Sequence, residues 1–225
     1  MRENLTHAIE DYLKAIYELT AVHGRASTNF LAEELNVKPG SVSGMIKKLA
    51  ETEPPLVEYE KHQGVVLTPE GEKVALEIIR HHRLLELYLH QILGYPWDKV
   101  HDEADRLEHV ISEEFEARIA EALGDPSHDP HGDPIPTIDL TLPPSTLVAL
   151  SQLRPGDRAA IRRVRDTDPE LLCFLEARGL VPQIHVQVVD YSPFDDNLTL
   201  QIEGQAEKLV LGPRITDQVF VESLA

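Results

Sequence analysis

The chain has 225 residues, of which 42% are hydrophobic, so it can form the core of one large domain or of two to three small ones. Its single cysteine excludes an intramolecular disulfide, and no apolar run reaches the roughly 18 residues needed to cross a bilayer. The net charge of −18 argues at first sight against binding to nucleic acid, which normally needs a basic face. The acidic side chains are concentrated in the middle of the chain, however, where residues 76–140 hold 15 acidic and only 5 basic ones. A local basic surface can therefore still form elsewhere. The first residues lack the apolar segment of a signal peptide, so we expect a cytoplasmic protein with no membrane partner.

The first 71 residues predict a winged helix-turn-helix. Residues 5–22 carry apolar side chains three or four positions apart, as an amphipathic helix does. Ser27 or Thr28 can cap a short helix that ends near Leu35, and Pro39 stands at the start of the next helix. Residues 56–60 and 65–67 then predict two strands around a polar turn.

The second helix of this motif predicts a DNA-reading face. Val42, Ile46 and Leu49 share one side of the helix, which leaves the serines and lysines of the same helix mostly outward. We expect contacts to phosphates or base edges in the major groove of operator DNA, with the wing on the DNA backbone. The candidates are Thr28, Ser41, Ser43, Lys47, Lys61 and Gln63. For Thr28, an N-cap role is an equal alternative.

Two long helices are predicted next, the first from about residue 69 to 93 and the second from Pro96 through Leu123. Their apolar positions exceed what one helix face in a small domain can bury. We therefore expect a homodimer formed through these helices, with Leu84, Leu87, Leu89 and Ile92 at its interface.

The same two helices carry metal-ligand side chains. At about 100° per residue, His101, Asp105, Glu108 and His109 fall on one arc of a helix, and His82 and Glu86 lie one turn apart on the preceding helix. Antiparallel helices that present histidines and carboxylates to each other are a way in which helical bundles build metal sites. The alternative is a solvated acidic face, but four potential ligands on one arc that face two more favour a metal site.

The last hundred residues differ from the rest of the chain in composition and in their hydrophobic pattern. Residues 125–144 contain six prolines, which predicts an extended linker and a domain boundary. Beyond it, β-branched segments alternate with glycine and proline turns, and a short helix is predicted from Glu170 to Arg178. This pattern predicts a small β-barrel.

Several motifs in one order resemble the diphtheria toxin repressor family of iron- and manganese-dependent regulators. They are Val37-Lys-Pro-Gly-Ser-Val-Ser, Leu67-Thr-Pro-Glu-Gly, His82-Arg-Leu-Leu-Glu86, the segment from Lys99 to His109, and His131-Gly-Asp-Pro-Ile-Pro136. The resemblance implies a mainly α fold with a small β part, in four segments. These are a winged helix-turn-helix at 1–71, a helical dimerisation and metal domain at 72–124, a linker at 125–145 and an SH3-like, FeoA-type barrel at 146–225.

The resemblance also implies the metal ligands. A primary site corresponds to Asp11, Asp105, Glu108 and His109, and an ancillary site to His82, Glu86 and His101, although the residue matching His82 can belong to the main site in manganese regulators. His131 and Glu170 are candidates for two further ligands, with Asp166 as the alternative to Glu170.

The predicted metal is Mn²⁺, with Fe²⁺ as the alternative. Iron regulators of the family tend to use sulfur ligands, whereas this chain has Asp11 and Asp105 at the matching positions, and carboxylates suit the harder ion. Lys14 stands where some manganese regulators place a glutamate that supports a close pair of metals, which argues against such a pair here.

These patterns predict a metal-dependent repressor of metal-homeostasis genes. A metal ion would tie Asp11 on the first helix to the central helices and so favour the DNA-binding state of a dimer. A metalloenzyme is the rival from another class, but the chain lacks paired Glu-x-x-His motifs and an evident nucleophile, so we expect no catalytic residues. A metal buffer that binds no DNA is a third alternative.

Overall fold

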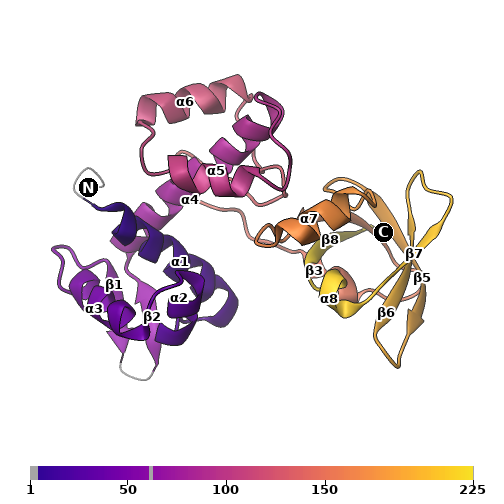
Figure 1. Cartoon of the computed structure of the whole chain (residues 1–225), viewed down its shortest axis with the longest axis horizontal. Helices are drawn as coiled ribbons and strands as arrows, with labels where there is room; N and C mark the ends of the chain where they lie inside the picture. Colours follow the sequence, from indigo (N-terminus) through magenta and orange to yellow (C-terminus); the bar gives the residue numbers. More distant parts are fainter. Residues whose placement is uncertain (1–4, 61–62, 225) are drawn as a thin grey trace. The chain divides into compact units, whose positions relative to one another are not determined.

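The structure is a computed structural model, and it describes residues 5–60 and 63–224. These residues form two compact units, and Figure 1 labels the helices and strands that they contain. The first unit runs through His82 and adds Leu107–Ser112 and Pro136–Thr141, and the second holds Arg83–Arg106, Glu113–Ile135 and the chain from Leu142 onward. No helix among the described residues is both long and apolar enough to span a bilayer.

The first unit contains the predicted winged helix-turn-helix. Its elements are α1 (His7–His23), α2 (Thr28–Glu34), α3 (Pro39–Ala50), β1 (Val57–Glu60) and β2 (Gly64–Leu67). The two strands pair antiparallel as the wing, and Ala26 adds an isolated bridge to Val65. Ser27 is the cap of α2, because its hydroxyl accepts a hydrogen bond from the Phe30 backbone N–H at 3.1 Å.

The faces of α3 lie as the sequence predicts. Val42, Ile46 and Leu49 are 0%, 2% and 0% exposed and pack into the core of the first unit. Ser41, Ser43 and Lys47 are exposed on the opposite side. The helix therefore anchors itself through one apolar stripe and leaves a small, polar surface outward.

Helix α4 (Pro69–Gln91) matches the first predicted long helix, but the second prediction is wrong. The chain forms α5 (Val100–Leu107), a turn, and then α6 (Glu113–Ala122). Val110 and Ile111 are β-branched and weak helix formers, and Ser112 followed by acidic residues is a start signal for a new helix. As a result, Glu108 and His109 lie in the turn rather than on the helix face.

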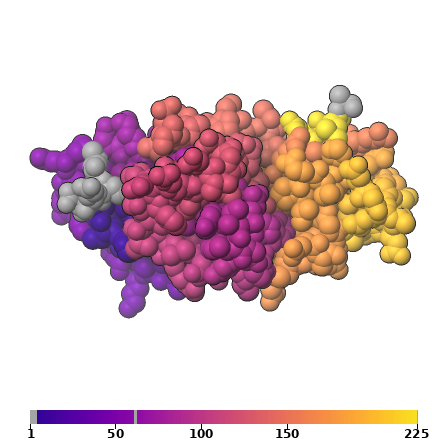
Figure 2. Space-filling view, turned by 90° about the horizontal axis from the view of Figure 1, so that it is seen from above, coloured from indigo at the N-terminus to yellow at the C-terminus, as the bar shows by residue number. Residues whose placement is uncertain are grey.

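The predicted dimer surface is also wrong in part. Leu84, Leu87 and Leu89 are 0%, 4% and 3% exposed, so they are already buried within the chain. Ile92 is 53% exposed, as predicted, and further exposed apolar side chains are Leu93, which also follows α4, and Phe115 on α6, at 55% and 46%. One face of this helical region is seen in the space-filling view (Figure 2).

The C-terminal part of the second unit is the predicted small barrel. A six-stranded antiparallel sheet runs in the order β3-β8-β4-β5-β6-β7. Its elements are β3 (Val148–Ala149), η2 (Leu150–Gln152), β4 (Arg158–Val164), α7 (Pro169–Glu176), β5 (His185–Ser192), β6 (Asn197–Ile202), β7 (Lys208–Leu211), α8 (Pro213–Thr216) and β8 (Val219–Leu224). Its core takes in Trp97, which comes from the loop between α4 and α5.

The proline-rich segment expected to be extended is packed in its first half. Asp129, His131 and Ile135 are 6%, 0% and 4% exposed. The His131 carbonyl accepts a hydrogen bond of 2.9 Å from the Val164 backbone N–H at the end of β4. The following residue is Gly132, and a Cβ there would lie 1.8 Å from the Arg162 carbonyl oxygen. Close approach of two backbones thus fixes this loop on the barrel.

We predict that Gly132→Ala destabilises the protein more than Gly204→Ala. Both glycines have positive φ, at +91° and +77°, so alanine is strained at either, at a cost of about 1–3 kcal/mol. Only Gly132 adds a backbone clash, since a Cβ at Gly204 meets nothing within 4 Å. Thermal denaturation of the two variants measures the difference, and equal melting temperatures would contradict the close approach.

Candidate metal centres

A first cluster of metal-ligand side chains lies in the first unit. Asp11 from α1 and Glu108 and His109 from the turn after α5 each offer a ligand atom, and these atoms lie within 4.8 Å of one another. His109 Nε2 is 2.8 Å from Asp11 Oδ1 and 3.6 Å from Glu108 Oε1. Folding therefore brings together residues almost a hundred positions apart.

Glu10 supports His109 from the other side of the ring. This carboxylate is 3% exposed, and its Oε2 lies 2.7 Å from His109 Nδ1. Burial acts to lower the pKa of His109, but the hydrogen bonds to Asp11 and Glu10 and the charge of Glu108 outweigh it and raise that pKa. The ring of His7 stacks on His109 with a centroid distance of 4.8 Å. The imidazole is thus held in one plane with Nε2 directed to Asp11.

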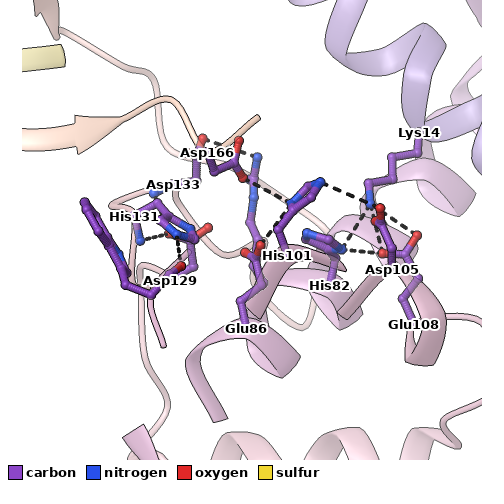
Figure 3. Close-up of polar contacts among 12 residues, drawn as sticks. Lys14, His82, Glu86, His101, Asp105, Glu108, Asp129, His131, Asp133 and Asp166 are labelled. Atoms are coloured by element: carbon purple, nitrogen blue, oxygen red, sulfur yellow. Dashed lines mark hydrogen bonds and ion pairs between the residues drawn. The ribbon is translucent and has the colours of Figure 1, made fainter. Parts of the chain in front are cut away.

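Glu108 is surrounded by positive or polar partners (Figure 3). Lys14 Nζ lies 2.9 Å from Oε2 and 3.2 Å from Oε1 of this carboxylate, and 3.1 Å from His82 Nδ1. His82 Nδ1 also contacts Glu108 Oε2. Burial acts to raise the pKa of Glu108, but His82 and Lys14 outweigh it and hold that pKa low. Glu108 is therefore kept as a carboxylate in a nearly dry position.

A second cluster lies in the second unit (Figure 3). His101 Nδ1 from α5 is 3.2 Å from Glu86 Oε1 on α4 and 3.5 Å from Asp166 Oδ2, which follows β4. His101 Nε2 is 3.6 Å from Asp105, one turn further along α5. Burial acts to raise the pKa of Asp166, but its hydrogen bond to His101 helps to keep that pKa low.

Asp129 and His131 extend this second cluster. Together with Glu86 they offer three ligand atoms within 4.8 Å of one another, and all three residues are buried. Asp129 Oδ2 and His131 Nδ1 have no hydrogen-bond partner among the residues that the structure describes. Burial, followed by the charges of Asp133 and Glu86, raises the pKa of Asp129 well above its usual value. Buried acceptors of this kind fit a cation, which would satisfy them and offset the clustered negative charge.

The structure thus distributes the predicted ligands over two clusters. Asp11, Glu108 and His109 meet in the first, where His82 contacts Glu108. Glu86, His101 and His131 belong to the second, and Asp105 contacts His101.

For the ligand expected from the C-terminal domain, the structure brings Asp166 rather than Glu170 to His101. Glu170 lies on the first turn of α7, and its side chain is exposed to solvent. Its backbone N–H donates to the side chain of the N-cap residue Asp168 at 3.0 Å. Glu10 and Asp129 were missed by the sequence analysis. Asp129 stands two residues before His131, and that spacing was the available signal.

The DNA-contact candidates lie on the winged helix-turn-helix. Thr28 is the first residue of α2 and half-buried, and Lys47 is exposed with an ion pair to Glu51 at 3.8 Å. Ser43 Oγ donates to the Pro39 carbonyl at 3.2 Å within its own helix. Gln63 is exposed at the wing and lies 3.5 Å from Arg25, whereas Lys61 lies outside the described residues.

Family models match nearly the whole chain. The family described as "Iron dependent repressor, N-terminal DNA binding domain" matches residues 4–65, and "Iron dependent repressor, metal binding and dimerisation domain" matches residues 68–137. The FeoA domain model matches residues 148–223. All three parts of the predicted fold class are therefore found in order.

Relatives of known function are similar over the same length. The chain is 32% identical to the iron-dependent repressor IdeR of Mycobacterium leprae over 98% of this chain and 99% of that protein. It is similar in structure to a manganese-dependent transcriptional repressor in complex with manganese, with a TM-score of 0.88, 38% identity, and coverage of 96% and 100%. The manganese regulator SloR gives a TM-score of 0.77 and 31% identity, with coverage of 96% and 98%.

We predict that Glu10→Gln lowers the pKa of His109 in the metal-free protein. The carboxylate favours the charged imidazolium, and the neutral amide does so less. Because the folded pKa of His109 is raised, the stability that this charge contributes is present below about pH 6.5 and is lost as the pH rises through the folded value. The variant should thus lose stability against the wild type mainly at low pH.

An NMR titration of the histidine ring protons measures this shift. Glu103→Gln removes the same charge at a position whose carboxylate pairs with Arg106 at 3.1 Å, and it serves as the control. A His109 titration that is identical in both variants would contradict the role of Glu10.

Proposed function

Because the chain belongs to the diphtheria toxin repressor family of metal-dependent transcriptional repressors, we propose that Mn²⁺ is the ion that controls its binding to operator DNA. Members of this family are repressors and not enzymes, they carry a DNA-binding and a dimerisation domain, and they respond to divalent metal. Both iron and manganese regulators are similar to the chain, so the choice of ion rests on the donor atoms. We place this regulator in the cytoplasm, where its operator DNA lies.

The observation that carries the proposal is that both clusters consist of carboxylates and imidazoles only. Oxygen donors suit Mn²⁺, while sulfur donors favour softer ions. The only cysteine, Cys173, is exposed on α7 and belongs to neither cluster. Iron(II) remains the alternative effector, since it accepts the same donors and an iron-dependent repressor is similar over the full chain.

We assign the first site to Asp11, Glu108 and His109. Asp105 and His82 are further candidates for this site. Asp105 precedes Glu108 by three residues in the sequence, and His82 contacts Glu108. Lys14 places an ammonium group 2.9 Å from Glu108, so a second ion on that side of the carboxylate would meet a positive charge. We therefore expect one ion in this site.

We assign the second site to Glu86, His101, Asp129, His131 and Asp166. Support comes from the buried Asp129 and His131 atoms that have no partner among the described residues, and from the raised pKa of Asp129. These residues come from α4, α5, the 127–135 loop and the segment after β4. An ion held by them would cross-link segments that the sequence separates widely.

The control of DNA binding follows from where the first site draws its ligands. Asp11 belongs to α1, which packs in the core of the winged helix-turn-helix, and Glu108 and His109 belong to the turn after α5. A divalent ion bound there would supply positive charge that holds these carboxylates and the imidazole together. It would thereby restrain the DNA-binding domain against the dimerisation region, and a restrained domain in each subunit would favour one spacing of the two DNA-reading helices.

For the DNA contacts we propose Ser41, Ser43 and Lys47 on α3, Thr28 at the start of α2, and Gln63 with Lys61 at the wing. Their exposed or half-exposed positions on one domain support this assignment, apart from Lys61, which lies outside the described residues. The domain carries few basic groups, so we expect at least two subunits per operator.

We predict that Mn²⁺ at micromolar concentrations stimulates binding to labelled promoter DNA, and that Asp11→Asn raises the half-activating concentration at least about tenfold. The variant keeps the side-chain volume and removes the ligand charge. Asp102→Asn makes the same change at an exposed position of α5 and should behave as the wild type. Fluorescence anisotropy with Mn²⁺, Fe²⁺ or chelator gives the values.

Stimulation by Fe²⁺ without stimulation by Mn²⁺ would reject the choice of ion and leave the family function intact. Equal half-activating concentrations for wild type and Asp11→Asn would reject the first site. DNA binding that no metal changes would reject both.

We predict that Lys47→Ala weakens DNA binding at every metal concentration and lowers the salt dependence by roughly one unit of slope, because a phosphate contact releases about one counterion. Lys73→Ala is the matched control, since Lys73 on α4 is 67% exposed and pairs with Glu70 at 3.8 Å, while Lys47 is 77% exposed and pairs with Glu51 at 3.8 Å. An unchanged slope for Lys47→Ala would remove this residue from the DNA interface.

A further inference from the structure

We propose that Trp97 is a positioning residue for the second site. It holds the ring of His131 in the orientation that binds the ion, and it couples metal binding at that site to the packing of the barrel core. The inference rests on the second site assigned above. It concerns a residue that offers no ligand atom itself and lies in the loop between α4 and α5.

Trp97 and the 127–135 loop are joined by two hydrogen bonds that run in opposite directions. The indole N–H of Trp97 donates to the Pro130 carbonyl at 3.1 Å, and His131 Nε2 lies 3.0 Å from the Trp97 carbonyl oxygen. The two rings also face each other at a centroid distance of 5.2 Å and a tilt of 31°. Three contacts therefore fix the backbone before His131 and the ring itself.

The bond to the Trp97 carbonyl determines which nitrogen of His131 is available. A carbonyl oxygen only accepts hydrogen bonds, so Nε2 carries the proton and the neutral ring keeps its lone pair on Nδ1. His131 Nδ1 is buried and has no hydrogen-bond partner in the described part of the chain. A metal-binding histidine commonly has its other nitrogen fixed by a carbonyl in this way.

Besides its contact with the His131 ring, the side chain of Trp97 packs in the core of the barrel. It is 4% exposed and packs in the same apolar cluster as Leu172, Leu200 and Val221. The loop it holds is also bonded to β4 through the His131 carbonyl and the Val164 N–H. A shift of His131 on metal binding would therefore change the surroundings of the indole and the packing of the barrel at the same time.

The matched test is a set of Mn²⁺ binding isotherms on the full chain, with free Mn²⁺ measured by electron paramagnetic resonance. We expect two classes of site in the wild type. His131→Gln should remove one class, Asp11→Asn should weaken the other at least about tenfold, and Asp166→Asn, at a more accessible position, should weaken the same class as His131→Gln. Trp97→Phe keeps an aromatic ring but removes the indole N–H, and it should weaken the His131 class about 10- to 100-fold while leaving the Asp11 class unchanged.

A variant of the barrel core separates positioning from general stability. Leu200→Val removes volume from the same cluster on β6, and it should lower the melting temperature while leaving both classes of Mn²⁺ site unchanged. Since Trp97 is the only tryptophan, its emission is a second readout. The emission change on adding Mn²⁺ should persist in Asp11→Asn and disappear in His131→Gln.

The outcomes distinguish the two proposals. If neither His131→Gln nor Asp166→Asn removes or weakens a class of site, the second site itself is wrong. If those variants do so but Trp97→Phe binds Mn²⁺ as tightly as the wild type, or Leu200→Val weakens the same class equally, then the positioning role of Trp97 is overturned and the second site stands.

Discussion

Carboxylates buried away from water are the constraint on which both clusters depend, because a buried charge is costly unless hydrogen-bond donors or opposite charges surround it. In the first unit, Lys14, His82 and His109 supply these partners to Glu108 and Glu10. In the second unit, Arg83 and Arg163 face Asp133 at 3.5 Å and 3.2 Å. Within the described part of the chain, Asp129 receives backbone N–H groups only at Oδ1, from His131 and Asp133 at 2.8 Å and 2.9 Å. The protein's own cations thus balance the first cluster more completely than the second.

This imbalance gives the two proposed sites different characters. In the first cluster, the charge of Glu108 is already compensated without a metal ion, since Lys14 and His82 stabilise this carboxylate. The second concentrates charge that raises the pKa of Asp129, so an ion bound there would relieve a cost that folding imposes. We therefore expect the second site to contribute more to the stability of its unit, and the first to act on the position of α1.

The sequence predicted the parts of this arrangement that depend on helical spacing. The buried stripe of α3 follows from side chains three and four apart, and the pairing of His82 and Glu86 on α4 follows from one helical turn. Glu10 could not be found in that way, because its partner His109 lies far along the chain. Asp129 lies in a loop with no repeating pattern, and its place two residues before His131 was the available signal. Glu108 and His109 were found, although by a helix that in fact ends at Leu107. Their closeness to Asp11 depends on the turn, which ligand spacing alone did not reveal.

Selectivity between ions has to arise after binding, because nitrogen and oxygen ligands bind Zn²⁺ more tightly than Mn²⁺ in any such site. Within the first cluster, Glu108 and His109 already have contacts to Lys14, His82 and Glu10. Asp11 differs, since its side chain is 45% exposed whereas that of His109 is 7% exposed. It is also the proposed ligand that belongs to α1. An ion whose preferred geometry omits Asp11 could therefore bind tightly to the turn and still leave α1 unrestrained, so we expect the DNA-binding response to follow coordination at Asp11 rather than affinity.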